Sequence, residues 1–140
     1  MKILIDTNIV LDVLLKRHPF YQDSFVIFKL IEQQRINGFL SASCITDIFY
    51  LLKKSMKNSV DVYPIMDELT RLFTVAPVNE TTVADALALR WKDFEDAIQF
   101  IVAKEGSIDF IITRNTVDYK IQDIPCMTPA EFIASFKEKT

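Results

Sequence analysis

Histidine and cysteine are scarce in this chain, and their scarcity removes whole classes of active site. The 140 residues contain one histidine, His18, and two cysteines, Cys44 and Cys126. A zinc site built from histidines is therefore excluded, and a serine–histidine–aspartate triad would have to use His18. The cysteines lie far apart and form no CxxC pair, so we expect two buried, reduced thiols in a cytoplasmic protein.

Long apolar runs and a positive net charge are also missing. No apolar run approaches the roughly 20 residues that a membrane helix needs, and the N-terminus lacks a signal-peptide pattern. The formal net charge is −3 at pH 7, so nucleic acid would have to bind through a local basic patch. With 50% hydrophobic and 25% charged residues, the composition predicts one soluble globular domain over residues 1–140 that does not bind membranes.

What the chain does contain is a regular alternation of short apolar strands with helices. The pattern predicts strands over residues 2–5, 38–42, 73–78, 108–113 and 125–128, and helices over residues 8–17, 20–36, 44–56, 59–73, 79–91, 93–106 and 129–139. Asn37 and Gly38 resemble a stop signal for the second helix, and Ser43 resembles the cap of the third. Thr128 and Glu131 form a capping box for the last helix. This alternation predicts an α/β fold with a parallel sheet covered on both faces.

Acidic residues follow several of the predicted strands. Asp6 comes directly after the first strand, Asp118 follows the fourth closely, and Asp47 lies early in the helix after the second. Asp93 and Asp96 open the sixth predicted helix. In open parallel sheets, ligands bind at the carboxyl ends of the strands. If these carboxylates share that edge, their mutual repulsion would be relieved by Mg²⁺ or Mn²⁺, and such a metal can activate water and clamp a phosphodiester.

Each of these acids also has an ordinary structural interpretation. An aspartate near the start of a helix, as at Asp6, Asp47 or Asp93, often caps the helix or interacts with its dipole. Asp118 alone fits a turn residue. A strand-ending aspartate can also be the nucleophile of an aspartyl-phosphate enzyme, but Asn8 stands where such sites carry a second aspartate. The joint placement of several acids at strand ends favours a shared site.

Three stretches, ILIDTNIVLDVL, DFEDAIQFIVA and IITRNTVDY, resemble the signature segments of the PIN domain. More narrowly, they resemble the bacterial PIN proteins related to VapC toxins. The resemblance extends from the first strand to IPCMTPAEFI near the end of the chain. It implies a three-layer α/β/α sandwich with a short central parallel sheet, and a ribonuclease that depends on Mg²⁺ or Mn²⁺.

The resemblance also assigns roles to residues. It places the first acid of the family on Asp6, the helix acid on Asp96, and the final acidic position on Asn115 or Asp118. The second acid of the family is usually glutamate, and here Asp47 occupies its place. The implied catalytic residues are thus Asp6, Asp47, Asp96 and Asp118, and the implied metal ligands are Asp6, Asp96 and Asp118. Supporting hydrogen bonds would come from Thr7, Asn8, Thr113 and Asn115.

A local basic patch for RNA is offered by the third predicted helix and by the segment after the fourth strand. Lys53 and Lys54 follow Asp47 on one helix, and Arg114 lies beside the proposed site. Together they could bind a phosphate backbone. The alternative is that the lysines only stabilise the C-terminal end of their helix.

The function that the sequence favours is a metal-dependent endoribonuclease that cleaves single-stranded RNA. As the toxin of a toxin–antitoxin pair, it would be covered at its acidic site by a separate antitoxin protein. Apolar surface on the second and third helices, together with the resemblance, predicts a homodimer. The alternative is a catalytically degenerate PIN module that binds nucleic acid or a protein without cutting. This alternative is favoured by Asp47 and Asn115, which stand in place of the family's usual acids.

Overall fold

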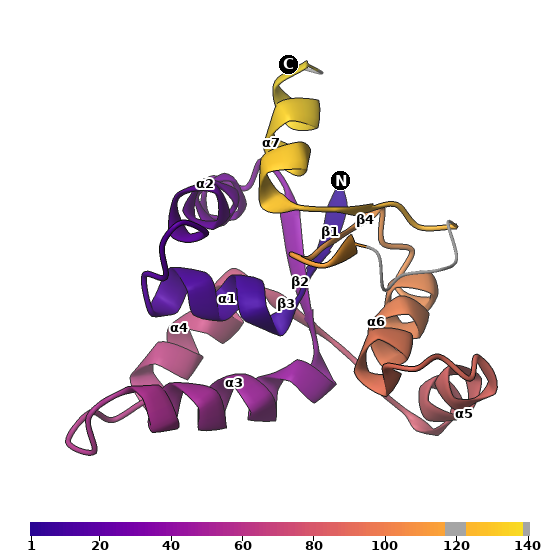
Figure 1. Ribbon diagram of the computed structural model, residues 1–140, viewed down its shortest axis with the longest axis horizontal. Helices are drawn as coiled ribbons and strands as arrows, with labels where there is room; N and C mark the ends of the chain where they lie inside the picture. Colours follow the sequence, from indigo (N-terminus) through magenta and orange to yellow (C-terminus); the bar gives the residue numbers. More distant parts are fainter. Residues whose placement is uncertain (117–122, 139–140) are drawn as a thin grey trace.

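A computed structural model describes residues 1–116 and 123–138, and its centre is a parallel sheet (Figure 1). The strands are β1 (Lys2–Ile5), β2 (Asn37–Ser41), β3 (Thr74–Ala76), β4 (Phe110–Ile112) and β5 (Cys126–Met127). They form one five-stranded sheet in the order β3-β2-β1-β4-β5, and every neighbouring pair is parallel. The predicted α/β fold with a parallel sheet is confirmed.

Helices cover both faces of this sheet. They are α1 (Thr7–Leu14), α2 (Tyr21–Glu32), α3 (Ala42–Ser55), α4 (Tyr63–Leu72), α5 (Glu80–Ala88), α6 (Phe94–Glu105) and α7 (Pro129–Glu138). Figure 1 shows α5 and α6 on one side and the other helices opposite. The side chains of β1 alternate accordingly, because Ile3 and Ile5 pack with the larger helical layer and Leu4 packs with α5 and α6.

The end of α2 differs from its prediction. Asn37 and Gly38 do not stop a helix; they are the first residues of β2, and α2 already ends at Glu32. Glycine is required at position 38 for close packing and not for a turn. A Cβ atom there would lie 2.6 Å from Cδ1 of Ile31 and 2.8 Å from the ring of Phe73. The local Asn-Gly signal was therefore wrong, because the reason for the glycine is a contact with a residue distant in sequence.

The start of α3 also differs, whereas the capping box of α7 is confirmed. The N-cap position of α3 belongs to Ser41 and not to Ser43, so Asp47 lies in the second turn of the helix. At α7, the backbone N–H of Glu131 donates to Oγ1 of Thr128 at 3.2 Å, and the N–H of Thr128 donates to Oε1 of Glu131 at 3.3 Å.

The two cysteines are free thiols, as expected, but they differ in exposure. Cys44 is buried, whereas Cys126 is only partly buried. Burial raises the pKa of both, that of Cys126 to about 11, so neither is a ready nucleophile. Within the described part of the chain, none of the helices has the length and apolar character that crossing a membrane requires.

The order of the strands indicates where on the sheet a binding site is expected. From β1 the chain continues to β2 and β3 on one side, whereas β4 and β5 lie on the other. The carboxyl ends of β1 and β4, which are neighbours, therefore flank a topological switch point. Asp6 follows β1 at this point and Thr113 follows β4.

Candidate active site: an acidic cavity at the end of the sheet

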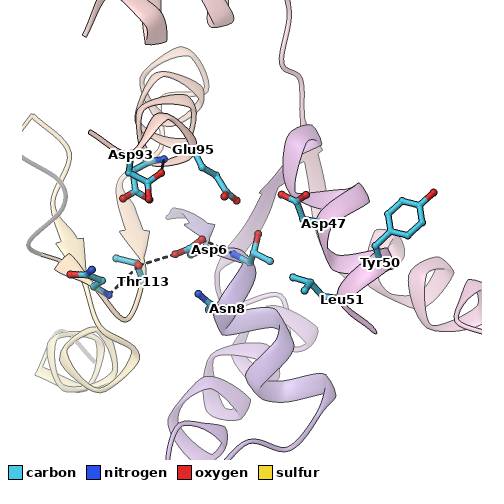
Figure 2. Close-up of a pocket in the computed structure, with 11 residues that line it drawn as sticks. Asp6, Asn8, Asp47, Tyr50, Leu51, Asp93, Glu95 and Thr113 are labelled. Atoms are coloured by element: carbon cyan, nitrogen blue, oxygen red, sulfur yellow. Dashed lines mark hydrogen bonds between the residues drawn. The ribbon is translucent and has the colours of Figure 1, made fainter. Parts of the chain in front are cut away.

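A cavity of about 560 Å³ opens at this switch point, and oxygen-bearing side chains dominate its wall (Figure 2). The wall is built by the start of α1, one face of α3, the start of α6 and the segment after β4. Its lining residues are Asp6, Thr7, Asn8, Asp47, Tyr50, Leu51, Asp93, Glu95, Asp96, Thr113 and Asn115. Sequence segments that are far apart thus bring five carboxylates to one space.

Asp6 is held firmly at the floor of this cavity. It is the N-cap residue of α1, and its Oδ1 accepts a hydrogen bond of 2.7 Å from the backbone N–H of Thr7. Its Oδ2 accepts a second bond of 2.9 Å from the hydroxyl of Thr113, which is buried. The N–H of Asn115 in turn donates to the Thr113 hydroxyl at 3.3 Å. Asp6 is therefore both a helix cap and a fixed carboxylate of the cavity.

The start of α6 supplies three further carboxylates. Asp93 is the N-cap of this helix, and its Oδ1 accepts a hydrogen bond of 3.1 Å from the N–H of Asp96. The capping interpretation of Asp93 is thus confirmed, although the residue also lines the cavity. Glu95 also belongs to the lining, and sequence reasoning missed it. An acid in the first turn of a helix gives no signal beyond an interaction with the dipole.

Glu95 carries the clearest electrostatic evidence of crowding. Partial burial raises its pKa, and the neighbouring carboxylates of Asp47, Asp6 and Asp93 raise it further. Figure 2 shows the Glu95 and Asp47 side chains extending toward each other from α6 and α3. The cavity therefore concentrates negative charge, and ionisation of Glu95 within it destabilises the folded state.

This crowding predicts that Glu95→Gln stabilises the metal-free protein at neutral pH. A raised pKa in the folded state means that ionisation of Glu95 lowers the free energy of unfolding. This loss begins as the pH rises above 4.5, the ordinary pKa of a glutamate side chain. Because much of the Glu95 side chain still reaches solvent despite its partial burial, solvent screening limits the expected gain to a few tenths of a kcal/mol at pH 7. The gain should vanish near pH 3, where both unfolded and folded states carry protonated acids. Urea unfolding in EDTA at both pH values measures it. Glu80→Gln is the matched control, because it also removes an exposed acid from the first turn of a helix, outside the cavity lining. A gain that is the same at both pH values would contradict the electrostatic cause.

The donor set of the cavity fits a hard divalent cation. Carboxylate, amide and hydroxyl oxygens are the ligands that Mg²⁺ and Mn²⁺ prefer. In residues 1–116 and 123–138, no three histidine, cysteine or acidic side chains gather closely enough to hold a metal by themselves. The acids surround the space instead, which suits Mg²⁺, because this ion keeps several waters and needs only one or two carboxylates. Asp118, the remaining predicted ligand, lies outside the described residues.

Of the residues predicted to bind RNA, Arg114 does not line the cavity. Its Nε lies 3.1 Å from Oδ2 of Asp12, which is fully buried, and its guanidinium lies over the Phe20 ring at 4.2 Å. Arg17 approaches the other Asp12 oxygen at 3.7 Å. Arg114 thus ties the segment after β4, including Thr113, to α1. Lys53 and Lys54 are exposed in the last turn of α3.

The fold and the cavity together define a parallel α/β protein with a carboxylate site at the switch point of its sheet. Residues 2–117 match the family described as PIN domain, and the chain belongs to this family. The family resemblance predicted from the three sequence stretches is confirmed.

Known relatives agree with this assignment. The chain is 24% identical over 136 residues to ribonuclease VapC1 of Aquifex aeolicus (strain VF5). The alignment covers 94% of this chain and 92% of the relative. Among solved structures, FitAB bound to the IR36 DNA fragment superposes with a TM-score of 0.69 at 20% identity, covering 91% of this chain and 94% of that one. A toxin–antitoxin complex from Klebsiella pneumoniae has a TM-score of 0.66 at 23% identity, covering 90% and 96%. These structural similarities show the fold.

Proposed function

We propose that this protein is a Mg²⁺- or Mn²⁺-dependent endoribonuclease that cleaves single-stranded RNA in the cytoplasm. The observation that carries the proposal is the convergence of Asp6, Asp47, Glu95 and Asp96 on one cavity at the switch point of the sheet. The similarity to ribonuclease VapC1 supports an RNA substrate. The alternative of a nucleic-acid-binding module without activity becomes an outcome of the test below.

In the proposed reaction, some residues would bind the metal and others orient these ligands. Asp6 and Asp96, with Asp118, would hold the metal, and Thr7 and Thr113 fix the orientation of Asp6. When bound, the metal would lower the pKa of a water and offset charge on the phosphodiester.

Two further acids complete this assignment. Asp47 and Glu95 face the same space from α3 and α6, so either carboxylate can accept the proton that an attacking water releases (Figure 2). Single strands are favoured because an unpaired backbone reaches a carboxylate-lined cavity more easily than a duplex does.

We further propose that the protein is the toxin of a toxin–antitoxin pair and a homodimer. A structural neighbour is a toxin–antitoxin complex, and a cationic segment of an antitoxin would complement the carboxylates of this cavity. Phe25 and Val26 on α2 are exposed apolar side chains, which supports a second copy of the chain as a partner of that helix.

The direct test is cleavage of end-labelled single-stranded RNA by the purified chain. We expect cutting with Mg²⁺ or Mn²⁺ and none in EDTA. RNA that is bound but left intact with both metals, across many sequences, would favour the degenerate module over an enzyme.

Thr113→Val tests the support of Asp6. The substitution keeps the shape of the side chain but removes the hydroxyl that donates to Oδ2 of Asp6. Because such supporting hydrogen bonds fix a ligand's orientation, we expect activity or metal affinity to fall about 10- to 100-fold. Titration of cleavage with Mn²⁺ measures both quantities. Thr70→Val on α4, outside the cavity lining, is the control, and equal behaviour of the two variants would contradict this role.

A further inference from the structure

An exposed tyrosine forms part of the wall of the acidic cavity. Tyr50 follows Asp47 by one turn of α3 and lines the cavity together with Leu51, yet the residue is 65% exposed. Figure 2 shows its ring on the far side of Asp47 from Asp6. The ring therefore lies at the rim, next to the carboxylates but clear of them.

Its surroundings hold this ring in place without covering it. The Phe49 ring makes an edge-to-face contact with Tyr50 at 5.2 Å and 78° between ring planes. Phe49 itself packs against the hydrophobic core. A tyrosine fixed by a neighbouring ring loses little freedom when a flat ligand stacks on it, and a nucleobase is such a ligand.

Cations continue the same helix beyond the ring. Lys53 and Lys54 lie three and four residues after Tyr50, so they share its side of α3, and both are exposed. At about 1.5 Å per residue, Asp47, Tyr50 and Lys54 are spread over roughly 10 Å of helix. The order along α3 is thus carboxylate, aromatic ring and ammonium groups.

We propose that Tyr50 is a base-stacking platform for the nucleotide beside the scissile phosphate, and that Lys53 and Lys54 bind the phosphate beyond it. Single-stranded nucleic acid presents the complementary series: a phosphate for the metal site, the face of an unpaired base, and the next phosphate. The inference rests on the proposed function and names how that site holds its substrate.

The test compares Tyr50→Phe, which keeps the aromatic face, with Tyr50→Leu, which keeps apolar bulk without it. Tyr63→Leu is the matched control, because Tyr63 is 66% exposed and also contacts Phe49, at 5.0 Å, but does not line the cavity. The probe is a set of short single-stranded RNAs that each carry one 2-aminopurine, whose fluorescence is quenched by stacking. Binding is measured in Ca²⁺, a hard cation that oxygen ligands also bind, and KM and kcat are measured in Mn²⁺.

Tyr50→Leu should raise Kd and KM about tenfold, with little change in kcat, and should abolish quenching at one position of the RNA. Tyr50→Phe should restore the quenching that Tyr50→Leu abolishes, because it keeps the aromatic face, and Tyr63→Leu should match the wild type. The salt dependence separates stacking from charge: Lys53→Ala and Lys54→Ala should each reduce the slope of log Kd against log salt by roughly 0.7, whereas Tyr50→Leu should leave it unchanged.

The remaining outcomes each overturn the inference. If the wild type cuts RNA and Tyr50→Leu keeps its KM, stacking is wrong while the proposed function stands. If Tyr50→Leu instead changes the sedimentation coefficient without affecting RNA, the rim is an interface between protein chains. If the wild type neither binds nor cuts RNA, the proposed function fails and the inference fails with it.

Discussion

Asp6→Asn and Asp96→Asn should each lower the rate of RNA cleavage by roughly a hundredfold or more, with the fold intact. Each change removes a negative charge that would hold the metal, and losses of this size are typical when one stabilising group of a transition state is removed. Asparagine serves as an N-cap as well as aspartate does, so position 6 keeps an oxygen for the N–H of Thr7. Asparagine at position 96 keeps the backbone N–H that donates to Oδ1 of Asp93, so the N-cap of α6 is retained.

The control for this experiment is Asp67→Asn, which changes an exposed aspartate of α4 outside the cavity lining. It should keep the wild-type rate. Single-turnover cleavage in Mn²⁺ gives the rates, and circular dichroism checks the fold. Cutting that persists at the wild-type rate in Asp6→Asn would mean that the carboxylates of this cavity do not carry the reaction.

The fold could be predicted because its signals are local. Each strand lies within a short apolar run of the sequence, and each helix has its own spacing of apolar residues, so the alternation could be predicted segment by segment. The placement of Asp6 follows from the same reasoning, since an acid directly after a buried parallel strand must lie at the carboxyl edge of the sheet.

Two features of the site could not be predicted because they depend on contacts between distant segments. Glu95 reaches the cavity only because α6 begins opposite α3, and nothing in DFEDAIQ separates it from an ordinary first-turn acid. Arg114 forms the second such contact, an ion pair with a residue distant in sequence. Its partner Asp12 is buried within α1, and an aspartate between apolar residues does not reveal which cation will neutralise it.

Gly38 is a third such case, and it gives the largest stability effect that we expect. Gly38→Ala should lower the free energy of unfolding by about 2 kcal/mol, because the new methyl group would lie 2.6 Å from Cδ1 of Ile31 and 2.8 Å from two atoms of the Phe73 ring. Both neighbours are buried, so they have little room to move. Urea unfolding followed by circular dichroism measures the change. Gly106→Ala is the matched control, since the nearest atoms to a Cβ there are Val102 O at 3.3 Å and Ile108 Cγ1 at 3.6 Å, and it should change stability by less than about 1 kcal/mol.

A second substitution tests whether the collision itself causes this loss. Ile31→Val removes Cδ1, the atom nearest to the new methyl group, and should cost about 1 kcal/mol by itself. In the double variant the methyl group takes part of the vacated space. The loss of stability in the double variant should therefore be smaller than the sum of the two single losses. The rescue should be partial, because the Phe73 ring still lies against the new methyl group. Strictly additive losses would instead place the cost of Gly38→Ala in the backbone of β2, and the close approach of α2 and Phe73 would not be the reason for glycine at this position.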